Sequence, residues 1–285
     1  MLSWKIGAVT VTRIVEMEVP MPHNPEAPFF EHGTPENLRR LPWLYPHFVN
    51  DQDQLLLSIH ALLVEAPGLR LVVDTCVGND KPRGAVGGLP LATPFLEHMA
   101  EAGWSRESVD TVVCTHLHVD HVGWNTMLVD GKWMPTFPNA RYLIGRDELA
   151  HWTAEGDDEQ QVILGDSIQP VLDAGLVDLV GLDHRLSPEV RLIPTLGHTP
   201  GHVSVMIESE GETAVITGDM AHHPCQLAHP DWGASFDVDQ TASSTTRRRM
   251  FAEWADQPIL VIGTHFAGPT AGRVRRDGEA YRLEV

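Results

Sequence analysis

Histidine is frequent in this chain, and the densest group of histidines also contains a carboxylate. The sequence has 16 His, almost as many as the 20 Lys and Arg residues together. Three imidazoles and one aspartate fall within six residues, in His116-Leu-His118-Val-Asp120-His121. Imidazole nitrogen and carboxylate oxygen are ligands for zinc and other divalent transition metals. The pattern therefore predicts a metal site, and the alternative is a loop of solvated polar side chains.

The cluster comes directly after residues 109–114, a short apolar run typical of a buried strand. Side chains alternate along an extended backbone, so we expect His116 and His118 to point the same way. Asp120 and His121 lie past a turn and can reach a second position. Because zinc-type ions take about four ligands each, this cluster alone cannot complete two sites.

Further candidate ligands lie far along the chain, at the ends of other predicted strands. His198, Asp219 and His265 follow residues 190–193, 213–217 and 259–262, and a nearby glycine permits a tight turn at each. Each residue alone has an equally good structural explanation. Four strand ends that all present metal-binding side chains favour one shared site. We expect His202 to have a structural or supporting role rather than to bind metal.

From about Ser58 to Phe266, the order of these motifs resembles that of the metallo-β-lactamase-fold hydrolases. The resemblance implies an α/β fold, an αββα sandwich with its site at one edge between the two sheets. It also implies a ligand set, in which His116, His118 and His198 hold the first metal, Asp120, His121 and His265 hold the second, and Asp219 bridges the two. Asp74, in Val72-Val-Asp74-Thr75, resembles the family aspartate that orients the ligand loop through hydrogen bonds. Its alternative role is to cap a turn.

Departures from the family pattern narrow the resemblance to one branch. His118 stands where flavodiiron members have Glu, and Asp219 stands where many β-lactamases have Cys or Ser. Only 20 residues follow His265 (285 − 265), too few for the helical domain of glyoxalase II. Lactonases, esterases and phosphotriesterases remain, and the resemblance points to the lactonase and methyl parathion hydrolase-like branch. His222, three residues after Asp219, stands where lactonases often have Tyr, and its alternative is a surface histidine.

The resemblance implies two divalent ions, with zinc as the first expectation and manganese, iron or cobalt as alternatives. A hydroxide bridging two such ions is available near neutral pH and attacks a carbonyl carbon or phosphorus. Asp120 or His222 would return the proton, which makes them the candidate catalytic residues. The predicted function is a binuclear hydrolase that opens lactones or cleaves carboxyl esters of hydrophobic small molecules. The alternatives are a phosphotriesterase, a mononuclear iron oxygenase or redox protein, and a metal-binding protein without activity.

Charge and composition exclude several other classes. The 20 basic and 39 acidic residues give a net charge of −19, which repels nucleic acids and anionic lipid, so neither is an expected partner. No apolar stretch approaches the ~18 residues of a membrane span, and the first residues lack the apolar region of a secretory signal. We therefore expect a cytoplasmic protein. Its 3 cysteines are too few for a disulfide framework, and Cys76 and Cys114 are predicted to be buried.

The predicted elements alternate without a linker, which indicates one domain. Strands are predicted at residues 55–64, 70–73, 109–114, 141–144, 176–180, 190–193, 203–208, 213–217 and 259–262, with a closing hairpin at 272–285. Helices are predicted at residues 91–102, from about 147, and at 241–256, where residues 247–249 are expected to form a solvated face. Residues 1–50 should form edge strands and an irregular arm, and residues 51–285 the hydrolase domain.

The arm is defined by proline and aromatic residues. Prolines recur between residues 19 and 48, and proline blocks regular structure. The interleaved aromatics are Phe29, Phe30, Trp43, Tyr45 and Phe48. With Trp124, they are candidates for the apolar wall of a pocket for an ester or lactone. The arm is also a candidate contact of a homodimer, and the alternative is a loop that packs on the core of its own chain.

Overall fold

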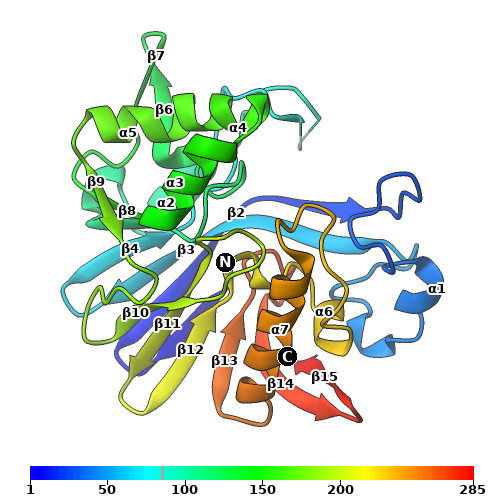
Figure 1. Cartoon of the computed structure of the whole chain (residues 1–285). Helices are drawn as coiled ribbons and strands as arrows, with labels where there is room; N and C mark the ends of the chain where they lie inside the picture. The colour runs from blue at the N-terminus through cyan, green and yellow to red at the C-terminus, as the bar shows by residue number, and fades with distance from the viewer. Residues whose placement is uncertain (85–86) are drawn as a thin grey trace.

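Large β-sheets lie face to face in the computed structural model, which describes residues 1–84 and 87–285, and helices cover their outer sides (Figure 1). The first sheet has the strand order β1-β2-β3-β4-β5-β8-β9. Its strands are β1 (Ser3–Ile6), β2 (Val9–Met21), β3 (Leu55–Ala66), β4 (Leu69–Val73), β5 (Thr111–Cys114), β8 (Arg141–Gly145) and β9 (Val177–Val180). The pairs from β1 to β4 are antiparallel, whereas β4, β5, β8 and β9 run parallel.

The second sheet has the order β10-β11-β12-β13-β14-β15. Its strands are β10 (Val190–Pro194), β11 (Val203–Ser209), β12 (Glu212–Ile216), β13 (Ile259–Ile262), β14 (Ala271–Asp277) and β15 (Ala280–Glu284). β12 and β13 are parallel, and α7 (Gln240–Trp254) lies in the connection between them. A separate hairpin of β6 (Thr126–Val129) and β7 (Lys132–Pro135) projects from the first half of the chain (Figure 1).

The remaining helices and turns lie in the connections between strands. They are α1 (Pro35–Leu38), η1 (Pro42–Leu44), α2 (Phe95–Glu101), η3 (Arg106–Ser108), η4 (Gly123–Asn125), α3 (Arg146–Glu155), α4 (Asp158–Ile163), the π-helical turn η5 (Leu164–Ile168), α5 (Gln169–Asp173), η6 (Gly218–Met220) and α6 (Cys225–Ala228). No helix within the described residues is long and apolar enough to cross a membrane.

Side chains alternate between the two faces of a central strand, so each strand contributes to a core on either side, and this explains the layers. Along β3, Leu62 and Val64 face the other sheet, whereas Ala61 and Leu63 belong to the core beneath α2. Because both faces of β3 are covered, nearly all of its residues are buried. A third core lies under α7, whose Phe251 packs on the outer face of the second sheet. These layers confirm the predicted αββα sandwich.

Most predicted elements appear within a few residues of their expected bounds. The helix expected at residues 91–102 begins only at Phe95, because Pro94 precedes it and proline disfavours helical backbone in the residue before it. The β6–β7 hairpin was not predicted. Cys76, Cys114 and Cys225 are buried free thiols, and burial raises the pKa of each one.

The N-terminal segment packs on the core of its own chain. β1 and β2 extend the first sheet, and the irregular residues after Met21 turn through α1 and η1. Phe30 and Phe48 are each 1% exposed and share the core under α7. Burial of these rings within the protomer removes them from any interface, so the structure gives the predicted homodimer contact no support.

Candidate metal centre

Every predicted ligand follows the carboxyl end of a strand, at one edge of the sandwich. Residues 116–121 come after β5, and His198 comes after β10. Asp219 lies in η6 after β12, and His265 follows β13. The strands end at the same edge, so these side chains converge although their positions in the sequence span 150 residues (from 116 to 265).

The first group joins nitrogen atoms from three imidazoles. His198 Nε2 lies 3.2 Å from His116 Nε2 and 2.9 Å from His118 Nδ1. His116 and His198 are buried, and the donor atoms of these histidines and Asp219 all lie within 4.8 Å of one another. A proton can satisfy one pair of such nitrogens at a time, whereas a shared cation satisfies all of them. The donor set fits a zinc-type ion.

The second group joins Asp120, His121 and His265. His121 Nε2 lies 3.2 Å from His265 Nε2. The oxygens of Asp120 lie 3.6 Å from His121 Nε2 and 3.5 Å from His265 Nε2. Two imidazoles and a carboxylate again form a donor set suited to a divalent transition metal.

Asp219 lies between the groups and reaches both of them. Its Oδ2 is 3.4 Å from His198 Nε2 and 3.2 Å from His121 Nε2, and its Oδ1 is 3.1 Å from His265 Nε2. Oδ1 is buried without a hydrogen-bond partner among the described residues. A buried oxygen that no hydrogen bond satisfies is costly unless a cation contacts it, so this carboxylate fits a position between two ions.

Hydrogen bonds from outside the groups orient the imidazoles. His121 Nδ1 donates to Asp74 Oδ2 at 2.9 Å, and His265 Nδ1 donates to the carbonyl oxygen of Ser58 at 3.0 Å. Asp74 also accepts from the backbone N–H and hydroxyl of Thr115, at 2.8 and 2.9 Å. Such contacts leave the opposite ring nitrogen to face the centre. Asp74 therefore joins His121 to the residue that precedes His116.

His202 contacts the backbone of Asp219. The backbone N–H of Asp219 donates to His202 Nε2 at 2.8 Å, and Nδ1 lies 3.0 Å from the carbonyl oxygen of Thr195. Burial lowers the pKa of His202 to about 3, in keeping with a neutral ring. Gly218 has φ +54°, and a Cβ there would lie 2.6 Å from His202 Nε2, so a larger residue does not fit. The expected supporting role of His202 agrees with these contacts.

Sequence analysis missed two buried carboxylates. One accepts a hydrogen bond from a candidate metal ligand, and the other accepts hydrogen bonds from the backbone near two of them. Asp237 Oδ1 accepts from His198 Nδ1 at 2.8 Å. Glu148 on α3 accepts from the backbone N–H groups of Leu117 and Gly201, at 3.1 and 2.9 Å, and so joins the segments that carry His118 and His198. Neither carboxylate lies in a motif, so no local pattern could have identified them.

His222 is buried, so the alternative of a surface histidine is wrong. Its Nε2 lies 3.2 Å from Asp219 Oδ2, and neither ring nitrogen meets hydrogen-bond geometry with any described residue. The ring is stacked with that of His265 at a centroid distance of 5.8 Å. Phe29 and Phe236 approach His222 edge-on at 5.6 and 5.2 Å. His222 therefore lies between the cluster and an aromatic wall.

That wall differs from the predicted one. Phe29 was expected, but Phe236, which is 43% exposed and lies 5.7 Å from the His198 ring, was missed. The assignment of Trp124 to this wall is wrong: the ring stacks on Phe95 at 5.4 Å, and its Nε1 donates to Glu16 at 2.7 Å.

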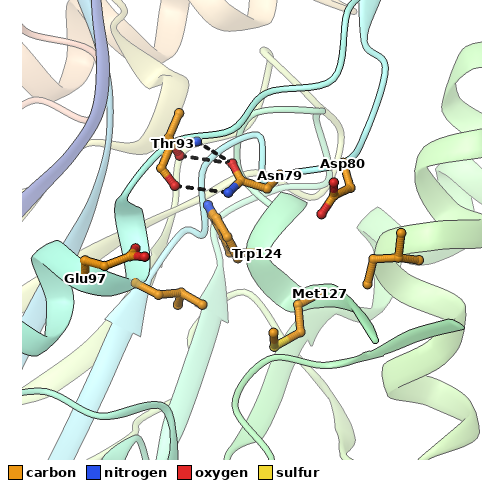
Figure 2. Close-up of a pocket in the computed structure, with 8 residues that line it drawn as sticks. Asn79, Asp80, Thr93, Glu97, Trp124 and Met127 are labelled. Atoms are coloured by element: carbon orange, nitrogen blue, oxygen red, sulfur yellow. Dashed lines mark hydrogen bonds between the residues drawn. The ribbon is translucent and has the colours of Figure 1, made fainter. Parts of the chain in front are cut away.

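Trp124 instead lines a separate cavity. This cavity holds about 200 Å³ and is bordered by residues around α2 and β6 (Figure 2). The labelled lining residues are Asn79, Asp80, Thr93, Glu97, Trp124 and Met127. None of the candidate metal ligands lines it. This cavity thus lies apart from the histidine cluster.

The solvated helix face expected at residues 247–249 is wrong at its first position. Arg247 is 0% exposed, whereas Arg248 and Arg249 are exposed. The guanidinium of Arg247 lies against the Asp237 carboxylate and several backbone carbonyl groups, which compensate the buried charge.

The pKa shifts of the buried groups in the cluster differ according to whether burial or neighbouring charge dominates. Burial lowers the pKa of His116 and His118 well below the usual range, and that of His198 to about 4. Burial also lowers the pKa of His121, but the carboxylates of Asp219, Asp74 and Asp120 outweigh it and raise the pKa overall. Burial favours neutral Asp219, but the surrounding imidazoles hold its pKa well below its ordinary value. The first group thus places neutral imidazoles beside an ionised carboxylate, as metal binding needs, whereas the carboxylates around His121 favour its protonated form.

Known proteins share both the sequence pattern and the fold. Residues 56–273 match the family model of the metallo-beta-lactamase superfamily. An N-acyl homoserine lactonase of Bacillus sp. is 27% identical over 166 residues, which cover 58% of this chain and 59% of that protein. An N-acyl homoserine lactonase of Bacillus thuringiensis is 25% identical over 225 residues, covering 73% of this chain and 82% of the relative. The matched region thus spans little more than half the length of the first of these relatives.

Two solved structures have a similar fold over almost the whole length of this chain. The hydrolase AbOPH of the beta-lactamase superfamily has a TM-score of 0.80 at 25% identity, covering 99% of this chain and 95% of the other. AidC, a dizinc quorum-quenching lactonase, has a TM-score of 0.81 at 20% identity, with coverages of 99% and 96%. The family match, which takes in residues 56–273, confirms the resemblance expected from the motifs, and this chain belongs to the metallo-β-lactamase superfamily.

Proposed function

We propose that this chain is a binuclear metal-dependent hydrolase that opens lactones or cleaves carboxyl esters of hydrophobic small molecules. The observation that carries the proposal is the position of Asp219, whose oxygens lie 3.4 Å or less from histidine nitrogens of both donor groups. The curated relatives are lactonases, which supports the same chemistry.

Each predicted ligand has a role in this proposal. His116, His118 and His198 would hold one ion, Asp120, His121 and His265 would hold the other, and Asp219 would contribute to both. Zinc fits the nitrogen-rich set, and manganese, iron and cobalt are the alternatives. A bound pair of such ions supplies Lewis acidity and makes hydroxide available near neutral pH.

Two side chains are placed to handle protons. His222 Nε2 lies 3.2 Å from Asp219 Oδ2, and its Nδ1 has no hydrogen-bond partner in the described chain, so a ring N–H can donate to a substrate oxygen. Asp120 is the more accessible carboxylate, with 22% of its side chain exposed against 3% for Asp219. Asp120 can therefore receive a proton and pass it to a departing alkoxide. We assign catalytic roles to both residues.

The surroundings favour an uncharged, apolar substrate. Phe29 and Phe236 contact each other edge-on at 5.2 Å next to His222, and Trp152 lies 5.2 Å from the His118 ring. Aromatic faces at the rim suit an acyl or alkyl group. The net charge of −19 disfavours anionic substrates.

A phosphotriesterase is the second candidate, and His222 is the observation that favours it. This position carries Tyr in many lactonases and His in the methyl parathion hydrolase-like members that the sequence resembles. A mononuclear iron oxygenase is less well supported, because the donor atoms form a second complete group around His121.

Metal analysis and a substrate panel test the proposal together. Protein purified without added metal is analysed for bound elements, and rates are measured on an acyl homoserine lactone, an aryl ester and an aryl phosphotriester. We expect two ions per chain, activity that a chelator removes and zinc restores, and the highest rate on the lactone or ester. A higher rate on the phosphotriester favours the second candidate. One iron per chain with oxygen uptake, or no turnover with both sites loaded, overturns the proposal.

A further inference from the structure

One buried guanidinium contacts the residue next to the candidate ligand Asp219 and a carboxylate that in turn contacts the candidate ligand His198. Arg247 on α7 donates from Nε to the carbonyl oxygen of Pro230 at 2.7 Å, and from Nη1 to Ser243 Oγ at 2.6 Å. Nη1 also lies 3.4 Å from Asp237 Oδ2 and 3.4 Å from the carbonyl oxygen of Met220. Met220 follows Asp219 directly in the sequence.

Asp237 connects this guanidinium to His198. One carboxylate oxygen faces Arg247, and the other accepts a hydrogen bond from His198 Nδ1 at 2.8 Å. The proton on Nδ1 leaves a lone pair on Nε2, which faces His116 Nε2 and His118 Nδ1. Both side chains of the ion pair are fully buried, so their interaction is not weakened by solvent.

The residues that follow Asp237 hold the backbone around His198. Val238 and Asp239 donate their N–H groups to the carbonyl oxygens of His198 and Gly197, both at 2.9 Å. Gly197 has φ +129°, and a Cβ there would lie 2.1 Å from the backbone nitrogen of Ser243. The first turn of α7 therefore lies directly on the backbone that carries His198.

We propose that Arg247 and Asp237 are positioning residues that fix the ring of His198 and the backbone next to Asp219 for the ion held by His116, His118 and His198. The inference rests on the proposed metal centre. The competing explanation is that the ion pair only stabilises the packing of α7. The two explanations differ in what happens to metal affinity in a variant that is still folded.

The test measures metal affinity in folded variants. Asp237→Asn keeps the side-chain volume and removes the charge, Arg247→Met removes the guanidinium, and Arg247→Lys keeps a positive charge without its planar shape. Arg248→Met is the matched control, since Arg248 is exposed on the same helix. Zinc affinity at each site is measured by competition with a chelating dye, and cobalt substitution reports the ligand geometry through its visible absorption.

We expect the wild type to bind two ions. Asp237→Asn and Arg247→Met should weaken one of them about 10- to 100-fold and change the cobalt spectrum, since partners of metal-binding histidines have effects of that size. The other ion should lose less affinity in both variants, because Asp219 is the one candidate ligand that it shares with the first. Arg247→Lys should lose less metal affinity than Arg247→Met, and Arg248→Met should bind both ions as tightly as the wild type.

Two results separate this inference from the proposed function. If the folded variants have a lower unfolding midpoint but unchanged affinities and spectra, the ion pair only packs α7 and the inference is overturned. If the wild type does not bind two ions, the proposed metal centre itself fails. Should Arg247→Met not fold, Asp237→Asn and Arg247→Lys decide the question by the same measurements.

Discussion

Glu148 permits a stability prediction that can be worked out from its contacts. Its Oε1 accepts from the Leu117 N–H at 3.1 Å and the Trp152 Nε1–H at 2.6 Å. Its Oε2 accepts from the Thr199 hydroxyl at 2.7 Å and the Gly201 N–H at 2.9 Å. All four partners can donate, and an ionised carboxylate accepts from all of them.

The substitution Glu148→Gln places an amide NH₂ among those donors. The best orientation turns the amide group toward Thr199, whose hydroxyl can accept, and leaves the Gly201 N–H unpaired. An unsatisfied buried donor costs about 1–3 kcal/mol, and the loss of charge weakens the remaining bonds. Burial raises the pKa of Glu148, so the cost of burying its charge offsets part of this loss. We expect the free energy of unfolding to fall by about 2–5 kcal/mol.

Urea unfolding of the metal-free protein measures this change directly. Glu155→Gln on the same helix is the matched control, because Glu155 is exposed, and it should alter the free energy of unfolding by less than about 0.5 kcal/mol. If Glu148→Gln is as stable as this control, the bonds from Leu117 and Gly201 do not hold the ligand segments together and the reasoning is refuted.

Three further predictions concern the cluster and the buried histidine beside it. Asp219→Ala should remove both ions and turnover together, as read by elemental analysis, and a variant that keeps two ions would contradict the bridging assignment. His222→Phe should keep both ions and reduce kcat about 100-fold if the imidazole donates to the substrate, whereas unchanged kinetics would remove His222 from the reaction. Burial lowers the pKa of His223 to about 4, below its unfolded value of ~6.5, so the unfolded chain takes up the proton first and folding stability falls as the pH drops from about 6.5 towards 4. This loss should reach about 3 kcal/mol and shrink in His223→Gln, and an identical pH dependence in urea unfolding of the two metal-free proteins would count against it.

The gathering of the candidate ligands was predictable because each one stands at a strand end beside a recognisable pattern. His116, His118 and His121 follow an apolar run, and Asp219 and His265 each follow a short buried strand. Strand ends at one edge of a sandwich lie together, so local patterns were enough to indicate one site. The αββα layers were expected from the family resemblance, whereas the order of elements indicated only one α/β domain.

The supporting residues were not predictable because their roles depend on contacts between distant segments. Asp237 lies 39 positions from His198, and Glu148 lies 53 positions from Gly201, with no spacing that marks either one. Arg247 stands beside two exposed arginines, and only the packing of α7 shows that it is buried. The direction in which Trp124 points is likewise decided by tertiary packing against Phe95.

Each donor group takes side chains from both sheets, with His116, His118, Asp120 and His121 from the first half of the chain and His198, Asp219 and His265 from the second. Bound ions would therefore cross-link the halves of the sandwich, and a saturating ion at 100 times its Kd adds about 2.7 kcal/mol to folding stability. Metal supply would then govern resistance to proteolysis as well as any turnover. A chain made when metal is scarce would be degraded sooner, so its abundance would follow the metal supply.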